Sequence, residues 1–409
     1  MEQAEILCAA SEDHILHEAS TNTLGSERHR HATTVSIKAM LTRLYIDNFR
    51  CFVNFECHFS NKQLIVGRNG SGKTSLLEVL LFLRQFAIAG QTTDNSPTLI
   101  LNRRTRWFKQ PQQTFEIEAS IDDASYAYRL VIEPWDEPVR ARVASETVHF
   151  NRKPIFEFIG GEVHLYNDQF EHKVAYPFDP HRSALATITE GTDNAKLIKF
   201  RNWFSNLICF KLNPFSMDSR TEAEQLYPNA DLSNFTAWYR HLVQTYPTEN
   251  YKFLDDLKAV MEDFESLKLE PFGENVRLLL AEFASPSKSH TKFSINELSD
   301  GQRCLICLYA ILHFVVANGS TVILDEPENF LSLREIQPWL IALTDVLDEG
   351  SGQVLLISHH PEFINQWAPK YGIQLIRDGA GPVRTKQFVD QLEYALPPAE
   401  LVARGWELE

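Results

Sequence analysis

The sequence predicts an α/β fold built around a phosphate-binding loop, with an antiparallel β lobe and an inserted helical lobe. Short apolar runs at residues 63–66, 321–324 and 353–357 end directly in glycine, acidic or histidine residues. Buried parallel strands end in this way at the sheet edge where ligands bind. Segments of alternating polarity occur between residues 115 and 159, and apolar residues at helical spacing fill much of 195–282.

The composition is that of a folded protein, with 44% hydrophobic and 23% charged residues in 409. Acidic residues outnumber basic ones by 54 to 39, so any contact with nucleic acid must come from a local basic patch. The six cysteines are scattered and do not suggest a disulfide framework, and Cys304 and Cys307 are expected to be buried core residues. We expect a cytoplasmic protein without a signal peptide or a membrane anchor.

The chain divides by pattern into four segments. Prolines at Pro228, Pro247 and Pro271 interrupt the helical region, so no sustained heptad predicts a long coiled-coil arm. The segments are a flexible N-terminal extension (1–39), the first half of the nucleotide domain with the β lobe (40–195), the inserted helical lobe (196–290) and the second half of the nucleotide domain (291–409).

The strongest motif is GRNGSGKT at residues 67–74, which matches G-x-x-x-x-G-K-[ST] between a predicted strand and a predicted helix. Its backbone N–H groups and the helix N-terminus would face phosphate oxygens. Lys73 would neutralise the β and γ phosphates, and Thr74 would ligate Mg²⁺. The motif predicts ATP and Mg²⁺ as cofactors, with a nucleotide-binding set of Gly67, Asn69, Gly70, Gly72, Lys73, Thr74 and Ser75.

Two further apolar strands end in polar groups. In TVILDEPE, at residues 321–328, Asp325 would hold Mg²⁺ directly or through water, and Glu326 would act as the general base or position the attacking water. In VLLISHHP, at residues 354–361, the strand ends in His359 and His360.

A fourth motif, LSDGQR at residues 298–303, precedes an apolar helix. A hydroxyl and a bare glycine amide at a helix N-terminus suit a phosphate, although Ser299 could equally be a simple N-cap.

Together, in this order, the four motifs resemble those of ABC ATPases. The sequences DEPENFL, at residues 325–331, and ISHHPEFI, at residues 357–364, resemble those of AAA-domain, ABC-like ATPases related to the OLD, RecF and SMC families. The resemblance implies that Ser299, Gly301 and Gln302 cap the γ-phosphate held by a second subunit, and that His359 contacts that phosphate.

The same resemblance implies a head-to-head homodimer or higher homo-oligomer and slow or partner-gated ATP hydrolysis. Asp300 departs from the usual signature glycine, and the Q-loop glutamine is not evident, with Gln112 and Gln113 as candidates. His360 stands where relatives often have serine.

The sequence says less about the biological function of the protein than about its nucleotide site. We expect it to regulate a separate effector, a nuclease or toxin, as ATPase subunits of anti-phage systems such as Septu and PARIS do. No nuclease motif is recognisable, and the short segment that follows the histidine pair predicts no C-terminal Toprim nuclease. The alternatives are a RecF-like DNA-maintenance ATPase and, more weakly, the ATP-binding subunit of a transporter.

A basic segment bears on that choice. The residues Arg103, Arg104, Arg106 and Lys109 flank Trp107 and Phe108 and would contact DNA or a partner, or form an ordinary solvated loop.

Overall fold

The computed structural model describes residues 39–93, 103–135, 140–285, 290–388 and 396–404. The predicted extension lies outside the described residues except for Ala39, which begins the first strand. Within the described residues no helix is both long and apolar enough to cross a membrane.

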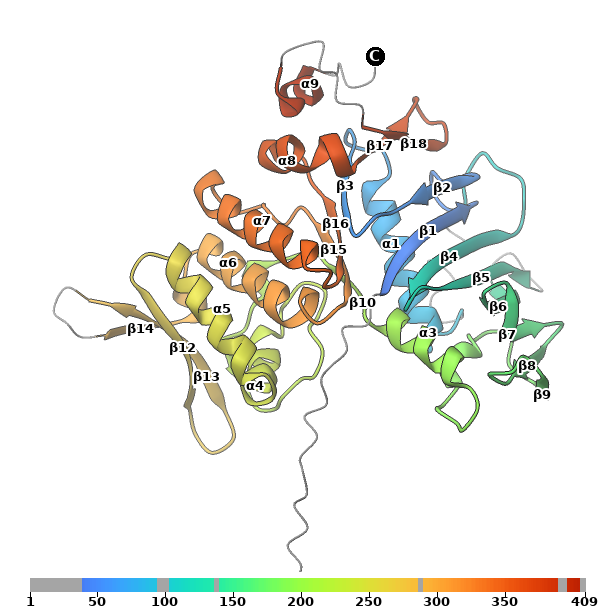
Figure 1. Cartoon of the computed structure of the whole chain (residues 1–409), viewed down its shortest axis with the longest axis horizontal. Helices are drawn as coiled ribbons and strands as arrows, with labels where there is room; N and C mark the ends of the chain where they lie inside the picture. The colour runs from blue at the N-terminus through green and yellow to red at the C-terminus, as the bar shows by residue number, and fades with distance from the viewer. Residues whose placement is uncertain (1–38, 94–102, 136–139, 286–289, 389–395, 405–409) are drawn as a thin grey trace, which may run out of the picture. The chain divides into compact units, whose positions relative to one another are not determined.

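An antiparallel sheet of eight described strands forms the predicted β lobe, in the order β2-β1-β4-β5-β6-β7-β8-β9 (Figure 1). Side chains of β4 alternate strictly between buried and half-buried, which is the pattern of a sheet with one face on the core. The strands are β1 (Ala39–Asp47), β2 (Phe55–His58), β4 (Gln113–Ile121), β5 (Ala124–Trp135), β6 (Arg140–Phe150), β7 (Lys153–Ile159), β8 (Glu162–Tyr166) and β9 (His172–Pro177).

The second sheet has six described strands in the order β10-β15-β16-β3-β17-β18, parallel except for the last pair. β3, β15 and β16 are buried on both faces, which explains their continuous apolar runs. Leu64 and Val66 face one hydrophobic cluster, whereas Ile65 faces the other. The strands are β3 (Lys62–Val66), β10 (Leu207–Phe210), β15 (Thr321–Asp325), β16 (Gln353–Ile357), β17 (Gly372–Arg377) and β18 (Val383–Gln387).

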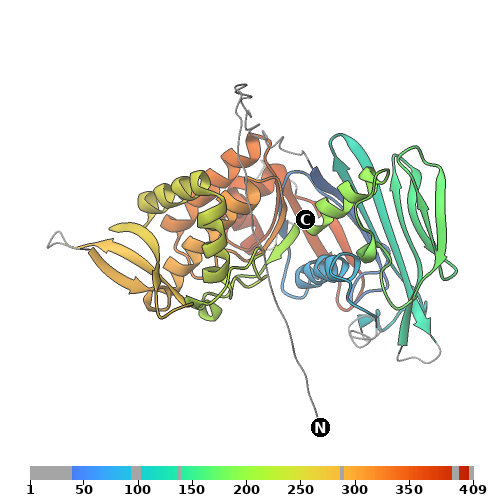
Figure 2. The ribbon, with the colours of Figure 1, turned by 90° about the horizontal axis from the view of Figure 1, so that it is seen from below.

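Helix α1 (Lys73–Ala87) lies between the two sheets (Figure 2). Phe82 of α1 packs against Phe115 of β4 with ring centroids 5.5 Å apart, and α1 also contacts β10 and β15. Helix α3 (Ala195–Ser205) contacts β7 and β10. The helix that begins at Lys73 is therefore fixed by both sheets.

Helices α6 (Asp300–Ile311), α7 (Leu333–Asp348) and α8 (Pro361–Tyr371) supply core residues to the other hydrophobic cluster, on the opposite face of the parallel sheet. The last turn of α6 continues as a π-helical segment, η5 (Leu312–Val316). Helix α9 (Pro398–Arg404) contacts α8. Single 3₁₀ turns are η2 (Leu185–Thr187), η3 (Pro214–Ser216) and η4 (Ile295–Glu297).

The segment predicted as a helical lobe is only partly helical. Helices α4 (Phe235–Thr245) and α5 (Pro247–Val260) follow the expected spacing. The expectation of helix up to residue 282 was wrong, because α5 ends at Val260, Met261 is already extended, and the following residues pair as strands. This region also contains an antiparallel sheet of four described strands. β11 (Arg220–Thr221) precedes α4, and β12 (Phe264–Pro271), β13 (Arg277–Ala284) and β14 (His290–Ser294) follow α5.

The predicted fold class is confirmed: a mixed α/β core carries an antiparallel β lobe. Strand β10 lies within the segment assigned by sequence to the insertion, yet it pairs with β15 in the central sheet. That pairing brings an unpredicted residue to the candidate site.

Candidate nucleotide-binding site

The loop between β3 and α1 is shaped by glycine. A Cβ atom on Gly67 would lie 2.5 Å from Ser71 Oγ and 2.7 Å from the carbonyl oxygen of Leu375. Gly72, the N-cap of α1, has a φ of 105°, a conformation that side chains disfavour. The loop therefore curls tightly against β17 and leaves the start of α1 open to a ligand.

Lys73 extends back along this loop. Its Nζ donates to the carbonyl oxygens of Gly67, at 2.7 Å, and Arg68, at 3.3 Å. Burial lowers the pKa of Lys73, while the nearby Asp325 and Glu326 oppose that change. An ammonium held only by loop carbonyls can be redirected to a phosphate oxygen, which is a far stronger partner.

The two acidic residues stand at the carboxyl edge of the sheet. Asp325 ends β15 and is 6% exposed. Glu326 has a φ of 49°, its N–H donates to Ile357 at 2.8 Å, and its carboxylate accepts from the amide of Asn329 at 3.1 Å. This bent backbone turns the chain sharply, so the two consecutive carboxylates both line the cavity described next.

A cavity of about 840 Å³ joins these groups. Its walls come from the loop and the start of α1, the end of β15 and several basic side chains. They comprise Arg50, Cys51, Asn69, Gly70, Gly72, Lys73, Thr74, Ser75, Arg103, Arg104, Arg106, Trp107, Lys211, Asp325, Glu326 and Arg377. A strongly cationic cavity of this size, with a glycine loop at its floor, suits a nucleoside triphosphate.

The donor set also fits Mg²⁺. Thr74 is exposed and lines the cavity with Asp325. Among the described residues no cluster of three or more His, Cys, Asp or Glu residues forms a complete metal site. One hydroxyl and one carboxylate, completed by phosphate oxygens and water, is how proteins hold Mg²⁺ beside a nucleotide.

The basic segment predicted to touch DNA or a partner is largely part of this cavity. Arg103, Arg104 and Arg106 line it, whereas Lys109 is not among the lining residues. Arg103 also forms an ion pair with Glu78 of α1, with Nη1 and Oε2 2.7 Å apart. Sequence reasoning missed this arrangement because nothing local indicates that residues 103–107 fold back over the phosphate loop.

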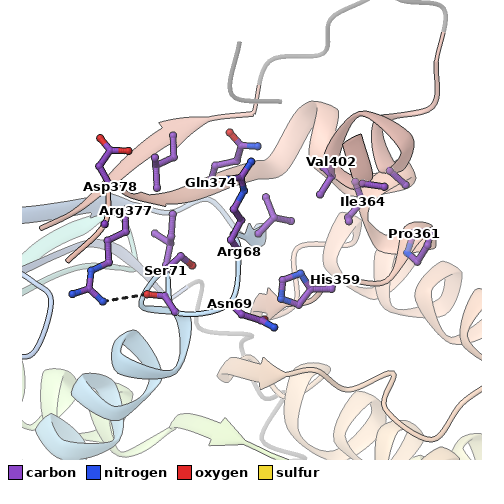
Figure 3. A pocket seen from close by; sticks show the side chains of 18 residues that line it. Arg68, Asn69, Ser71, His359, Pro361, Ile364, Gln374, Arg377, Asp378 and Val402 are labelled. Atoms are coloured by element: carbon purple, nitrogen blue, oxygen red, sulfur yellow. Dashed lines mark hydrogen bonds between the residues drawn. The ribbon is translucent and has the colours of Figure 1, made fainter. Parts of the chain in front are cut away.

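The two histidines have different surroundings. His360 caps α8, its Nδ1 accepting from the N–H of Glu362 at 3.2 Å. His359 lines a second cavity of about 500 Å³, which shares Asn69 with the first (Figure 3), and it is not among the described lining residues of the first cavity. Burial, followed by the charge of Lys73, lowers the pKa of His359, so the imidazole is favoured in its neutral form.

The signature residues form the N-terminus of α6. Ser299 Oγ accepts from the N–H of Gln302 at 3.2 Å, and the Gln302 side chain accepts from the N–H of Ser299 at 3.0 Å. This reciprocal capping box holds Gly301 at the first turn. None of the three lines the described nucleotide cavity of the same chain.

Asp300, the departure from the usual signature, is neutralised. Its carboxylate forms an ion pair with Arg303, one turn along the same helix. Arg303 Nη1 also donates to the carbonyl oxygen of Pro214 at 2.6 Å. The extra negative charge is thus balanced beside the helix N-terminus.

The candidate Q-loop glutamines do not reach the cavity. Gln113 begins β4 and its amide donates to the carbonyl oxygen of Asn48 at 2.9 Å. Gln112 donates to Glu133 at 3.0 Å. Lys211, which follows β10, instead lies against Asp325, and the sequence offered no signal for it.

Comparison with known proteins decides the family. Residues 64–365 match the family model described as "AAA domain, putative AbiEii toxin, Type IV TA system". The chain belongs to this AAA-domain family. No protein of curated function matches it.

Solved structures agree on the fold of this AAA-domain protein. It is similar to an SMC head bound to the C-terminal winged-helix domain of ScpA, with a TM-score of 0.51 and 12% identity, covering 87% of this chain and 99% of the other. It is also similar to the SMC head of Pyrococcus furiosus with an extended coiled coil, bound to the C-terminal domain of ScpA, with a TM-score of 0.51 and 12% identity, covering 89% and 100%. The expected likeness of the fold to that of SMC-type heads is confirmed.

Proposed function

We propose that this AAA-domain protein is an ATPase that binds Mg²⁺-ATP in the cationic cavity and closes over it as a head-to-head dimer. The observation that carries the proposal is the meeting of Lys73, Thr74, Asp325 and Glu326 in one cavity. These residues come from two distant parts of the chain, and chance does not readily assemble them at the carboxyl edge of a parallel sheet.

The proposed chemistry divides among the side chains. Lys73 leaves its loop carbonyls and neutralises the β and γ phosphates. Thr74 and Asp325 hold Mg²⁺, which when bound screens phosphate charge and orients the γ-phosphate. Glu326 orients the attacking water and accepts its proton, and neutral His359 donates a hydrogen bond to the γ-phosphate.

The position of the signature residues supports the proposed dimer. Ser299, Gly301 and Gln302 are outside the described lining of their own chain's cavity, yet they present an exposed helix N-terminus suited to phosphate. A second copy related by two-fold symmetry would bring this N-terminus to the γ-phosphate. ATP would then hold the two copies together, and hydrolysis would release them.

The proposed output is control of a separate effector, a nuclease or toxin, in cytoplasmic anti-phage defence. The family description names a toxin of a toxin–antitoxin system, and the similar SMC heads are bound to a domain of another protein, ScpA. A net charge of −15 disfavours general binding to nucleic acid. Three of the four basic residues considered for DNA contact line the nucleotide cavity, which further favours a protein effector.

The first test uses Glu326→Gln, which removes the base and keeps the shape. With Mg²⁺-ATP this variant should elute as a stable dimer while its ATP turnover falls at least about 100-fold. Full turnover in the variant would rule out the proposed role of Glu326. Lys73→Ala should remain monomeric with ATP and serves as the control for nucleotide-dependent assembly.

The output is tested by mass spectrometry of proteins that copurify with Glu326→Gln expressed from its native gene neighbourhood. A stoichiometric nuclease or toxin that leaves when ATP is omitted supports effector control. The RecF-like alternative predicts instead that the purified chain binds DNA alone, with an affinity that falls steeply as salt rises.

A further inference from the structure

Lys211 lies beside the carboxylate expected to hold the metal. Strand β10 pairs in parallel with β15, with Phe210 opposite Leu324. The next residue of each strand is therefore at the same sheet edge, and Lys211 Nζ lies 3.1 Å from Asp325 Oδ2. Both side chains line the nucleotide cavity.

The two members of this ion pair differ in freedom. The side chain of Asp325 is 5% exposed, whereas that of Lys211 is 66% exposed. The backbone of Lys211 is held by its N–H, which donates to the carbonyl oxygen of Ala230 at 2.8 Å. The ammonium can thus leave Asp325 without disturbing core packing, while the backbone and the carboxylate stay in place.

Lys211 and a bound Mg²⁺ would compete for the same carboxylate. In the nucleotide-free cavity the ammonium offsets the charge of the buried Asp325, which would otherwise repel an incoming triphosphate. When Mg²⁺ arrives with ATP, repulsion between the two cations favours displacement of the exposed lysine. The displaced ammonium remains within the cavity, where phosphate oxygens are its natural partners.

We propose that Lys211 is a positioning residue that acts as an exchangeable counter-cation for Asp325 and sets the Mg²⁺ requirement of ATP binding. The inference rests on the proposed function of the same cavity. It adds a specific consequence: the protein binds ATP measurably without Mg²⁺, and Mg²⁺ must compete with Lys211 to complete the site.

The test is a titration of a fluorescent ATP analogue into the full-length protein, either in EDTA or at graded Mg²⁺. Lys211→Gln should bind the analogue about three- to tenfold more weakly in EDTA, because the buried carboxylate then loses the cation that lies 3.1 Å from it. The same variant should need about three- to tenfold less Mg²⁺ for half-maximal binding. Both readouts are binding measurements and do not depend on turnover.

Lys199→Gln is the matched control, because Lys199 is an exposed lysine paired with Asp122 outside the described cavity lining. It should behave as the unaltered protein does. In an Asp325→Asn background, Lys211→Gln should no longer shift the Mg²⁺ dependence, because the shared partner is gone.

Unchanged EDTA affinity and unchanged Mg²⁺ dependence in Lys211→Gln would overturn the inference while leaving ATP binding intact. A shift of equal size in the Asp325→Asn background would also overturn it, because Lys211 would then act without Asp325. Failure of the unaltered protein to bind the analogue even at saturating Mg²⁺ would instead remove the proposed function itself.

Discussion

The carboxylate of Glu328, on the loop after β15, accepts a hydrogen bond from the hydroxyl of Ser358, just beyond the end of β16. The N–H of His359 approaches the same oxygen at 3.4 Å. Glu328 is buried, and desolvation raises its pKa. This contact ties the acidic loop that carries Glu326 to the segment that carries His359.

We expect Glu328→Ala to reduce ATP turnover about tenfold or more, with little change in ATP affinity, because His359 and Glu326 lose their common support. Glu328→Gln keeps an oxygen that accepts from Ser358 and should recover most of the turnover. Steady-state kinetics on the two variants check this. Equal loss in both, or a loss confined to KM, would contradict a positioning role.

The composite site can be tested by mixing inactive variants. Lys73→Ala lacks the phosphate lysine, and Ser299→Arg blocks the capping N-terminus, so each alone should hydrolyse almost no ATP. A 1:1 mixture should regain between about a quarter and about a half of wild-type turnover, because each mixed dimer has one intact site and neither variant has one by itself. No recovery after mixing, with subunit exchange verified, would argue for a site complete within one chain.

The basic side chains that line the cavity provide a third prediction. Arg106→Ala should weaken ATP binding about three- to fivefold at low salt and less at high salt, because an exposed charge near the phosphates is screened. Lys109→Ala is the matched control: it is also exposed but is not among the lining residues. Calorimetric titration at two salt concentrations separates the two, and equal effects would assign the segment to another partner.

Glu146 provides a prediction for stability. It is a buried residue of β6 in the β lobe, it accepts a hydrogen bond from the hydroxyl of Tyr128 at 2.9 Å, and desolvation raises its pKa to about 7. The unfolded carboxyl titrates near about 4.3, so between these values the folded state binds the proton more tightly. The resulting stability is fully present below about pH 4 and is lost as pH rises through about 7, and it amounts to about 4 kcal/mol.

Thermal unfolding of the protein and of Glu146→Gln between pH 5 and 8 checks this sign. The melting temperature of the unaltered protein should fall relative to that of the variant as pH rises and drop below it by about pH 7, because the amide introduced by the substitution has no proton to release in this range. The variant also lacks an oxygen acceptor for the N–H of Ala184, which should cost about 1–2 kcal/mol at low pH. A difference that is constant across the range would place the pKa of Glu146 outside it.

The sequence was sufficient to predict those features for which one short segment contains all the residues that define the feature. The glycines of residues 67–72 need no distant partner to predict a phosphate loop, and the apolar runs before Asp325 and His359 predict buried strands. Ser299 was likewise considered as an N-cap because it precedes an apolar helix, and the structure shows that cap. These parts of the site and the fold class were therefore predictable.

The remaining features depend on pairing between distant segments. Strand β10 has only four residues and follows α3, so nothing local separates it from a helical region. Lys211 is brought beside Asp325 only by the pairing of β10 with β15. Residues 264–284 contain apolar side chains compatible with either period, and strand pairing between β12 and β13 decides their structure.

The five described cysteines are all buried. Desolvation raises the pKa of the thiol to about 12 at Cys57, Cys209 and Cys304, and raises it also at Cys51. Because the thiolate is the reactive form, alkylation of these positions should be slow. Among them only Cys51 lines the nucleotide cavity. A ligand that fills this cavity should therefore slow the alkylation of Cys51, and peptide mapping of the unaltered chain can measure that rate.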